Sequence, residues 1–375
     1  MTTSQSQGGF HLAAEDVLPG HPDRLCDAIA ESIVDLAVAH DPDALVGVEV
    51  GIHREMAFVT GRIAAGDSGA PLRLDLDAVA NDIYARAGYS GAWQLRPRIE
   101  ADLDLGPLSP EERAIRGFSD DQNLVVGHAV GCEETGFLPL PVFLARSIRR
   151  ALSELRENCS DRLGPDGKVL VRLQPGPAGP AWKRLNLAIQ HAEGLGYHEL
   201  HQLTQRALEP VFDECRNLVA HPGKSWGTDV LRLNGAGEFS CGGPKGDNGL
   251  SGKKLVVDHY GPGVPIGGGA LCGKDPHKVD RIGALCARQL AVRLLHATGA
   301  HEVTTYLGYL PGLEAPDMLS ALVGDEWWDA DRIAAAIPLP DLSIAGSFDR
   351  FELAGVRWTE VLRSGYFGGR WTWER

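Results

Sequence analysis

The chain has few lysines and no excess of positive charge. Only eight of its 36 basic residues are lysine, and all eight lie between Lys168 and Lys278. The formal net charge is −14, whereas proteins that neutralise nucleic-acid backbones are usually basic. Nonspecific nucleic-acid binding is therefore not expected, and any anion that the chain binds needs a local site.

Long apolar runs and paired cysteines are also missing. No run approaches the eighteen or so residues of a membrane span. The first residues, MTTSQSQGGF, show neither the basic region nor the apolar region of a secretion signal. We therefore expect a cytoplasmic protein without a membrane partner. The seven cysteines show no CxxC spacing, so free thiols are expected.

The chain alternates between helical periodicity and strand-like runs in three units of comparable size. Further predicted elements follow a helix over 21–40, where Pro22 suits the first turn. They are strands at 44–52 and 55–64, a helix at 76–87, a helix around 144–155, strands at 168–173 and 184–192, a helix near 200–215, a helix at 275–296 and a strand at 302–310. The second unit begins at the segment 120–130. The pattern predicts an α+β protein with domains over 10–108, 117–227 and 228–375, although no sequence repeat is strong enough to prove internal duplication.

Residues 241–281 combine glycines, cations and carboxylates, and five of the eight lysines lie there. Three glycines at 267–269 precede a predicted helix start, where Asp275 suits the N-cap and Pro276 the first turn. The free N–H groups of that helix start would face the same place as Lys274 and Lys278, which favours a bound anion. The stretch 268–274 also fits the Walker pattern GxxxxGK, but Asp275 replaces the magnesium-binding hydroxyl. A solvated basic turn is the alternative interpretation.

Carboxylates accompany these cations. Asp23 and Asp27 lie four residues apart on one face of the first predicted helix, and Asp280 follows the lysines. Magnesium commonly bridges phosphates to one or two carboxylates, so Asp23 and Asp280 are candidate ligands. Asp23 could equally serve as a helix cap.

Several segments together carry a specific resemblance. The segments GHPDRLCDAIAESIVD, DDQNLVVGHA, GPDGK, AIQH, CGGPKGDNGLSGKKLVVDHYG, GGGALCGKDPHKVDR and GYFGGRWTWE resemble, in order, the signature segments of S-adenosylmethionine synthetases. The resemblance spans about residues 10–374. It implies a three-domain α+β protomer with pseudo-threefold internal similarity, and active sites between the subunits of a homodimer, often paired into a homotetramer.

The family reaction joins the sulfur of L-methionine to C5′ of ATP and expels triphosphate, which is then hydrolysed to diphosphate and phosphate. The resemblance implies that His21 hydrogen-bonds the polyphosphate near the cleaved bond, with Lys168, Lys274 and Lys278 beside it. It also implies that Asp23 and Asp280 bind Mg²⁺ and that Glu49 helps to bind K⁺. The implied nucleotide contacts are Glu15, Asp166, Lys168, Phe239, Asp247, Lys253, Lys254, Ala270 and Lys274. The implied contacts with the amino acid are Arg62, Asp121, Asp247 and Lys278.

The chain departs from the family pattern mainly on the amino-acid side. Arg62 stands where the family has a glutamate that contacts the methionine ammonium, and Leu108 stands where a glutamine opens the mobile gating loop. That loop is also shorter than usual. The remaining departures are Glu238 in the arginine-phenylalanine pair beside adenine, DDQN at 120–123 for GDQG, and Leu271 with Cys272 for phenylalanine-serine.

Three hypotheses fit this pattern. In the first, the chain is a methionine enzyme in which another acidic residue binds the ammonium group of methionine. In the second, it is an adenosyltransferase for a different nucleophile, whose carboxylate or other anion faces Arg62, because guanidinium binds such groups bidentately. The third is a catalytically silent regulatory paralogue, against which the retained His21, Asp23 and Asp280 argue. The second hypothesis predicts that Arg62→Glu improves activity with methionine.

Overall fold

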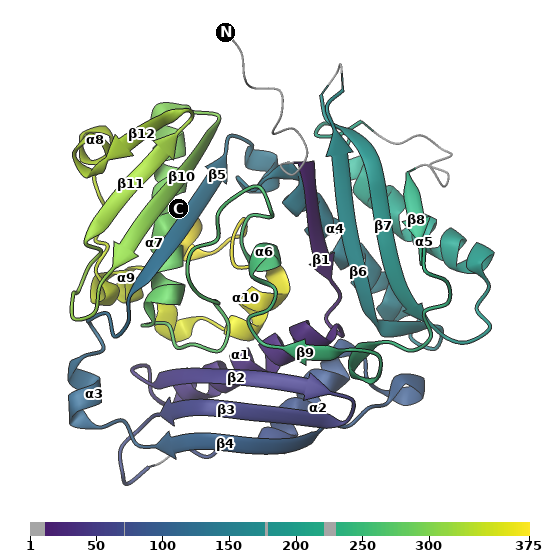
Figure 1. Ribbon diagram of the computed structural model, residues 1–375, viewed down its shortest axis with the longest axis horizontal. Coiled ribbons are helices and arrows are strands. Elements are labelled where there is room, and N and C mark those ends of the chain that lie inside the picture. Colours follow the sequence, from purple (N-terminus) through teal and green to yellow (C-terminus); the bar gives the residue numbers. More distant parts are fainter. Residues whose placement is uncertain (1–11, 71, 177–178, 221–229) are drawn as a thin grey trace.

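The computed structural model describes residues 12–70, 72–176, 179–220 and 230–375. Its described part contains three four-stranded sheets, arranged around a common centre in Figure 1. The α+β architecture expected from the sequence is confirmed. The predicted domain limits at residues 10 and 227/228 lie outside the described residues, and the division into contiguous domains stays a prediction.

The first sheet has the order β4-β3-β2-β9. β2 (Leu45–His53) and β3 (Met56–Ala64) form an antiparallel hairpin, β4 (Arg98–Gly106) runs parallel to β3, and the short β9 (Asn248–Leu250) comes from far along the chain. Two helices, α1 (Pro22–His40) and α2 (Leu76–Ala87), cover one face of this sheet. The opposite face carries both polar and apolar exposed side chains, such as Glu49 of β2 and Phe58 of β3.

The second sheet has the order β1-β6-β7-β8. β1 (Ala13–Val17) pairs antiparallel with β6 (Leu163–Gln174), which pairs with β7 (Ala181–His191), and β8 (Leu231–Leu233) lies parallel to β7. Along β6, buried Val169, Val171 and Leu173 alternate with exposed Lys168, Leu170 and Arg172, as a half-buried strand requires. The buried side packs against α4 (Leu140–Asn158), on which α5 (Tyr197–Glu214) lies.

The third sheet has the order β12-β11-β10-β5. β5 (Asn123–Val130) pairs over its whole length with β10 (Glu302–Tyr309), which continues to β11 (Met318–Val323) and β12 (Glu326–Asp329). The long helix α7 (Val279–Thr298) packs on β5 and β10. Each sheet therefore has one long helix against it.

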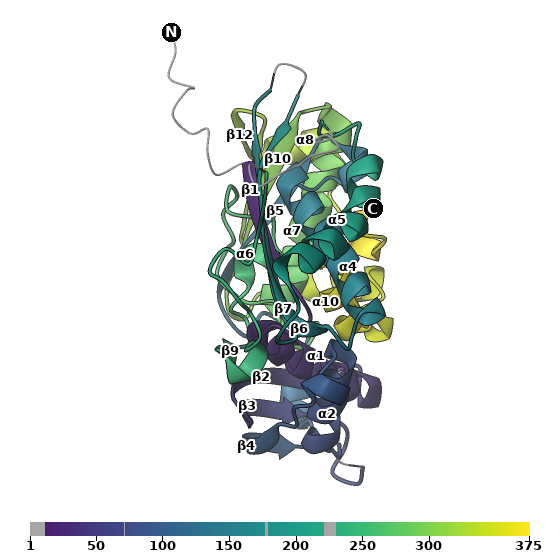
Figure 2. The same cartoon turned by 90° about the vertical axis from the view of Figure 1, so that its right-hand side faces the viewer.

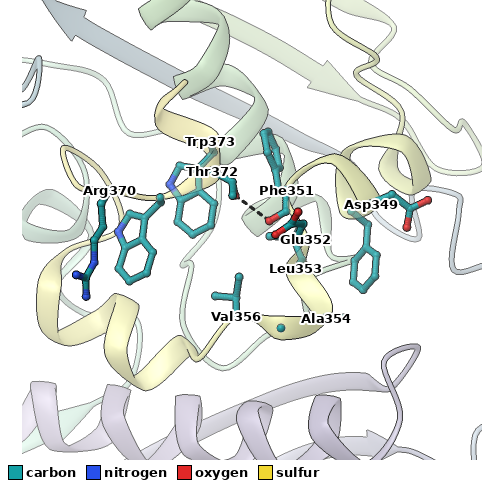
Figure 3. Close-up of a pocket in the computed structure, with 12 residues that line it drawn as sticks. Asp349, Phe351, Glu352, Leu353, Ala354, Val356, Arg370, Thr372 and Trp373 are labelled. Carbon is teal, nitrogen blue, oxygen red and sulfur yellow. Dashed lines mark hydrogen bonds between the residues drawn. The ribbon is translucent and has the colours of Figure 1, made fainter.

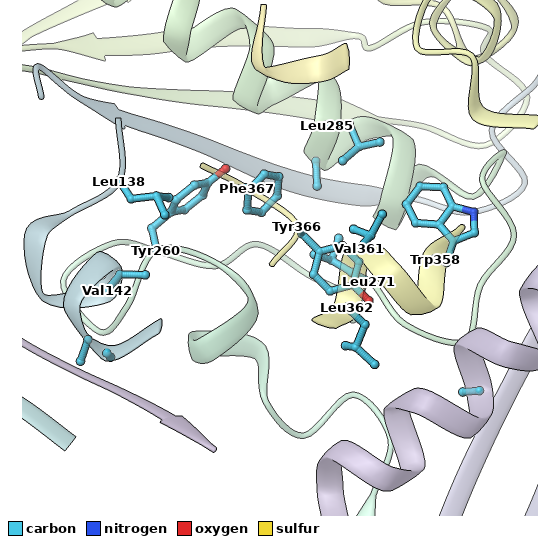
Figure 4. Packing of buried hydrophobic residues seen from close by; sticks show 14 of the residues in the cluster. Leu138, Val142, Tyr260, Leu271, Leu285, Trp358, Val361, Leu362, Tyr366 and Phe367 are labelled. Atoms are coloured by element: carbon cyan, nitrogen blue, oxygen red, sulfur yellow. The ribbon is translucent and has the colours of Figure 1, made fainter. Parts of the chain in front are cut away.

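Seen from the side, the long helices lie on one side of the molecule and the sheets on the other (Figure 2). Four shorter helices pack against these elements: α6 (Leu255–Asp258) contacts β1, α8 (Ala330–Ala336) and α9 (Ile344–Arg350) contact α7, and α10 (Trp358–Ser364) contacts α1. Near the centre, Tyr260 stacks on Phe367 with ring centroids 4.9 Å apart, and Tyr366 and Leu271 are fully buried nearby (Figure 4). None of the described helices is both long and apolar enough to cross a bilayer.

Some elements differ from the sequence expectations. The last long helix begins at Val279 instead of 275, because residues 275–278 form a turn and Lys278 takes the N-cap position. β4 and the short helix α3 (Pro110–Ala114) were not predicted. α3 carries a recognisable signal, since Ser109 and Glu112 form a reciprocal capping box.

Candidate functional site

His21 lies at the N-cap of α1, and its ring is buried. Its Nδ1 accepts a hydrogen bond from the backbone N–H of Asp23 at 3.2 Å, so the proton of the neutral ring is on Nε2. Burial, together with the charges of Lys254 and Lys168, lowers the pKa of His21 to about 3. Within the described residues, Nε2 has no hydrogen-bond partner. The site therefore contains a buried neutral donor that has no partner among the described residues.

Asp23 lies in the first turn of α1 and connects this helix to β9 and the loop that follows it. Its carboxylate accepts the backbone N–H of Leu250 at 3.0 Å, pairs with Lys254, and lies 3.7 Å from Nζ of Lys253. Burial alone would raise the pKa of Asp23, but the bonds from Lys254 and Leu250 hold it below its ordinary value. Two of the predicted nucleotide-binding lysines are thus anchored beside His21.

Asp166 and Lys168 of β6 also lie near His21. Asp166 is buried and accepts the N–H of Gly243 at 2.8 Å, while its other oxygen, Oδ1, lacks a partner in the described part of the chain. Burial raises the pKa of Asp166 despite that hydrogen bond and the charge of Lys168. Phe239 lies close by, with its ring against Gly242. Sequence reasoning placed these residues around the nucleotide, and the structure brings them together.

The buried carboxylate of Asp27 joins the two loops that carry the lysines. Its Oδ1 accepts the N–H of Gly252 at 2.8 Å and the thiol of Cys272 at 3.1 Å, and its Oδ2 accepts from Arg24 at 3.1 Å. Burial raises the pKa of Asp27 to about 7, although Arg24 opposes the shift. Burial likewise raises the pKa of the Cys272 thiol. Cys272 is therefore a packed, protonated donor that positions a loop, which matches the expectation of a free thiol.

Lys274, Lys278 and Asp280 lie at the start of α7. Lys274 pairs with Asp280 at 2.7 Å, and Lys278 pairs with Asp120, which directly precedes the predicted contact Asp121. Gly269 allows this crowding, because a Cβ there would come within 1.6 Å of Asp280 Oδ1. Asp120 was not among the predicted site residues, although it lies in the segment that replaces the family's GDQG.

Arg62 does not present a free guanidinium. Its Nη1 pairs with Asp104 of β4, while Nε and Nη2 donate to Glu112 of α3, with Nε at 3.2 Å. The N–H of Ser109, followed by Arg62, lowers the pKa of Glu112, so this carboxylate is ionised. One cation and two carboxylates make this cluster negative as a whole. Neither acid was singled out from the sequence, because partners from an unpredicted strand and helix leave no local pattern.

The remaining predicted residues lie at separate places, two on strands and three in loops. Glu49 accepts a hydrogen bond from the hydroxyl of Ser251 on the exposed face of β2, and Glu15 is exposed on β1 opposite Leu170. Asp121 and Asp247 are exposed, and each accepts the N–H of the residue that follows it. Ala270 packs near Gly252, beside Lys253.

The acidic side chains of this site suit magnesium only when phosphate oxygens of a bound substrate also coordinate the ion. Among the described residues, three or more His, Cys, Asp or Glu side chains do not gather into a metal-binding group. Asp23 and Asp280 pair with different lysines. Magnesium is usually held by one or two carboxylates plus phosphate oxygens and waters. Asp23 and Asp280 fit that mode, and Glu49 with Ser251 offers adjacent oxygen donors for potassium.

A separate open cavity of about 430 Å³ lies between α9, the turn at 353–356 and the C-terminal residues 370–373 (Figure 3). Phe351 and Trp373 line it, and the hydroxyl of Thr372 donates to the carbonyl of Phe351 at 2.8 Å. The predicted site residues are not part of its lining. The cavity is thus distinct from the cluster around His21.

Comparison with known proteins shows which family the chain resembles. Residues 9–98 match the model of the S-adenosylmethionine synthetase N-terminal domain, and residues 241–375 match that of the C-terminal domain. The S-adenosylmethionine synthase of Rhodospirillum centenum is 31% identical over 393 residues, covering 99% of this chain and 97% of that protein. That of Mycolicibacterium gilvum is 32% identical over 354 residues, covering 87% of this chain and 85% of that protein.

A solved structure described as an unusual S-adenosylmethionine synthetase from Campylobacter jejuni shares the fold, with a TM-score of 0.84. The superposition covers 97% of this chain and 96% of the Campylobacter jejuni chain, and the two sequences are 24% identical. From the domain matches and the full-length relatives, the chain belongs to the S-adenosylmethionine synthetase family.

Proposed function

We propose that this protein makes S-adenosylmethionine from ATP and L-methionine, releasing triphosphate and hydrolysing it to diphosphate and phosphate. The observation that carries the proposal is a pair of buried polar atoms, Nε2 of His21 and Oδ1 of Asp166, which lie beside three lysines and have no partner in the part of the chain that the structure describes. Buried polar groups are rarely left unpaired, so a ligand that is both anionic and hydrogen-bonding is the natural occupant. A nucleoside triphosphate has both properties.

For this reaction the main catalytic task of the protein is to stabilise the negative charge of the leaving triphosphate. A thioether sulfur has no proton to lose, so no general base is needed for the attack on C5′. The neutral His21 donates from Nε2 to the oxygen on which charge develops, and the lysines near it supply fixed positive charge. Such preorganised donors in a water-poor site often give the largest single contribution to rate.

Magnesium and potassium complete the proposal. Asp23 and Asp280 would hold Mg²⁺ together with phosphate oxygens, and Glu49 would help to hold K⁺. Bound magnesium neutralises charge on the leaving triphosphate. The protein is proposed to act in the cytoplasm as a homodimer or homotetramer, with each active site between two subunits.

We favour L-methionine over an anionic compound as the nucleophile because of the charged cluster around Arg62. The guanidinium already has two carboxylate partners from its own chain, Asp104 and Glu112. The negative cluster attracts an ammonium group, and this supports the hypothesis that another acid replaces the family's glutamate. Arg62→Glu is consequently a poor test of the nucleophile, since it would also set three carboxylates together beside α3.

The experiment that tests this function incubates purified protein with ATP, Mg²⁺ and K⁺, with and without L-methionine. S-adenosylmethionine is followed by mass spectrometry, and phosphate and diphosphate by coupled assay. We expect a methionine-dependent product with one phosphate and one diphosphate per turnover, and loss of the product in a Lys274→Met variant. ATP consumption without S-adenosylmethionine would point to a different nucleophile, and the absence of ATP binding to a silent paralogue.

A further inference from the structure

Arg116, in the turn after α3, is buried against the segment that carries Lys274 and Lys278. Its side chain is 7% exposed, and its Nη2 pairs with the carboxylate of Asp275, which is fully buried. Nε and Nη2 also donate to the carbonyls of Asp43 and Ala44, both at 3.1 Å. One guanidinium thus binds three acceptors from two separate parts of the chain.

Asp275 in turn organises the residues around it. One oxygen accepts the N–H of Val46 at 2.8 Å, and the other accepts the N–H of His277 at 2.9 Å as well as Arg116. The backbone N–H of Asp275 donates to Val46 O at 3.0 Å, and its carbonyl accepts from Lys278 at 3.2 Å. The turn is therefore attached to β2 by main chain and side chain together. Lys274 directly precedes it and Lys278 ends it.

The arginine supplies the charge that this turn requires. A carboxylate that has left water needs an opposite charge as well as hydrogen bonds, because backbone donors alone leave its charge uncompensated. The planar fork of arginine reaches Asp275, Asp43 O and Ala44 O at once, whereas a lysine ammonium is a point charge on a flexible stem. Arg116 therefore determines where Asp275 sits, and with it the two flanking lysines.

We propose that Arg116 is a positioning residue for polyphosphate binding, which aligns Lys274 and Lys278 through the buried carboxylate of Asp275. This rests on the proposed function, because it assumes that these lysines bind the triphosphate of ATP. Arg116 lies in the turn after α3 and pairs with Asp275, which lies between the two lysines. Glu112 of α3 pairs with Arg62 on the amino-acid side of the site. The short segment between β4 and β5 thus supports both sides of the site.

The test compares Arg116→Lys with Arg113→Lys, the same chemical change one helical turn earlier. Arg113 pairs with Asp41 and Asp43 and does not contact Asp275. Binding of inorganic tripolyphosphate with Mg²⁺ is measured by calorimetry on the full-length protein, with thermal melting as the control for folding. We expect Arg116→Lys to weaken binding about tenfold, because a small misplacement of binding groups is costly. Arg113→Lys should bind as the wild type does.

Turnover gives a second readout that a loss of stability alone would not produce. Arg116→Lys should lower kcat and raise KM for ATP while KM for methionine stays unchanged. If Arg116→Lys does not fold, Asp275→Asn takes its place, because it removes the same ion pair from the other side with nearly the same shape.

The outcomes separate this proposal from the proposed function. Equal affinity of a folded Arg116→Lys and the wild type, or equal weakening by Arg113→Lys, would overturn the positioning role. A wild type that binds tripolyphosphate but makes no S-adenosylmethionine would refute the function and leave the role of Arg116 testable by affinity. A wild type that does not bind tripolyphosphate would overturn both.

Discussion

At the scale of single residues, burial converts His21 from a titrating group into a permanent hydrogen-bond donor. With its pKa lowered to about 3, the ring is neutral throughout the physiological range, and the hydrogen bond to Nδ1 places its proton on Nε2. A protonated imidazole would add charge, but it would also repel Lys254 and Lys168. The neutral form can approach a polyphosphate in a cluster that is already cationic.

Replacement of His21 by Asn tests this assignment. We expect kcat to fall about 10²–10³-fold with a small change in KM for ATP, which is typical when one donor to developing charge is removed. The wild-type kcat should show no inflection from this histidine between pH 5 and 8. Steady-state kinetics across that range provide the measurement, and an inflection near pH 6.5 that disappears in the variant would contradict the neutral-donor role.

The lowered pKa of His21 also makes the free energy of unfolding depend on pH. Between pH 6.5 and 3 the unfolded chain binds a proton at His21 that the folded chain does not, so the free energy of unfolding falls as the pH falls through that window. His21→Asn should make this decline less steep. Denaturant titrations at several pH values would show whether the two curves converge at low pH.

Glu112 is the residue most suited to compensate for Arg62. We expect Glu112→Gln to raise KM for methionine about tenfold and to leave KM for ATP unchanged, because a hydrogen bond to a charged group contributes roughly 1.5–3 kcal/mol. Glu111→Gln, an exposed neighbour on the same helix, is the matched control. Unchanged KM for methionine in both variants would show that the ammonium binds elsewhere.

At the scale of elements, the tight contact between β5 and α7 sets the position of Lys278. A Cβ at Gly127 would come within 2.1 Å of the backbone of Ala287 on the helix. Gly127→Ala should therefore separate the helix from the sheet and cost about 1–3 kcal/mol or more of stability. Gly131→Ala, whose nearest neighbour would be 3.4 Å away, is the control. Similar melting temperatures for both variants would contradict this packing argument.

The helices could be predicted better than the partners of the strands. The helix predicted at 76–87 is found at Leu76–Ala87 and ends at Gly88, which has the left-handed conformation, because such an end signal is local. By contrast, β5 was grouped with the elements that follow it, yet it pairs with β10 some 170 residues later. Alternation along a strand indicates which face is buried and carries no information about its neighbour.

The same limit applies to the site. His21, Asp23, Lys168 and Lys254 were identified from motifs, and the structure brings them into one cluster. Arg116 and Glu112 were missed because their roles depend on partners at Asp275 and Arg62, distant in sequence. Residues that touch a ligand leave a motif, whereas residues that position them are defined only by tertiary contacts.

At the scale of the whole molecule, Glu49 and Lys168 lie at exposed positions of the strands β2 and β6, whereas His21 and Asp23 lie at the start of α1. Exposed apolar side chains occupy strands of all three sheets, among them Phe58, Leu124, Leu170 and Leu250. Asp23 and Asp280 pair with different lysines, which accords with the proposal that each active site is assembled from two subunits.

Complementation between two inactive variants tests that assembly. Asp23→Asn and Asp280→Asn should each abolish most activity, because each removes a proposed magnesium ligand. If a site takes Asp23 from one subunit and Asp280 from the other, a mixed dimer contains one intact site. Random pairing should then restore roughly one quarter of wild-type activity after co-expression. If both carboxylates of a site came from one chain, every site in the mixed dimer would lack one of them, and activity would stay at the level of the separate variants.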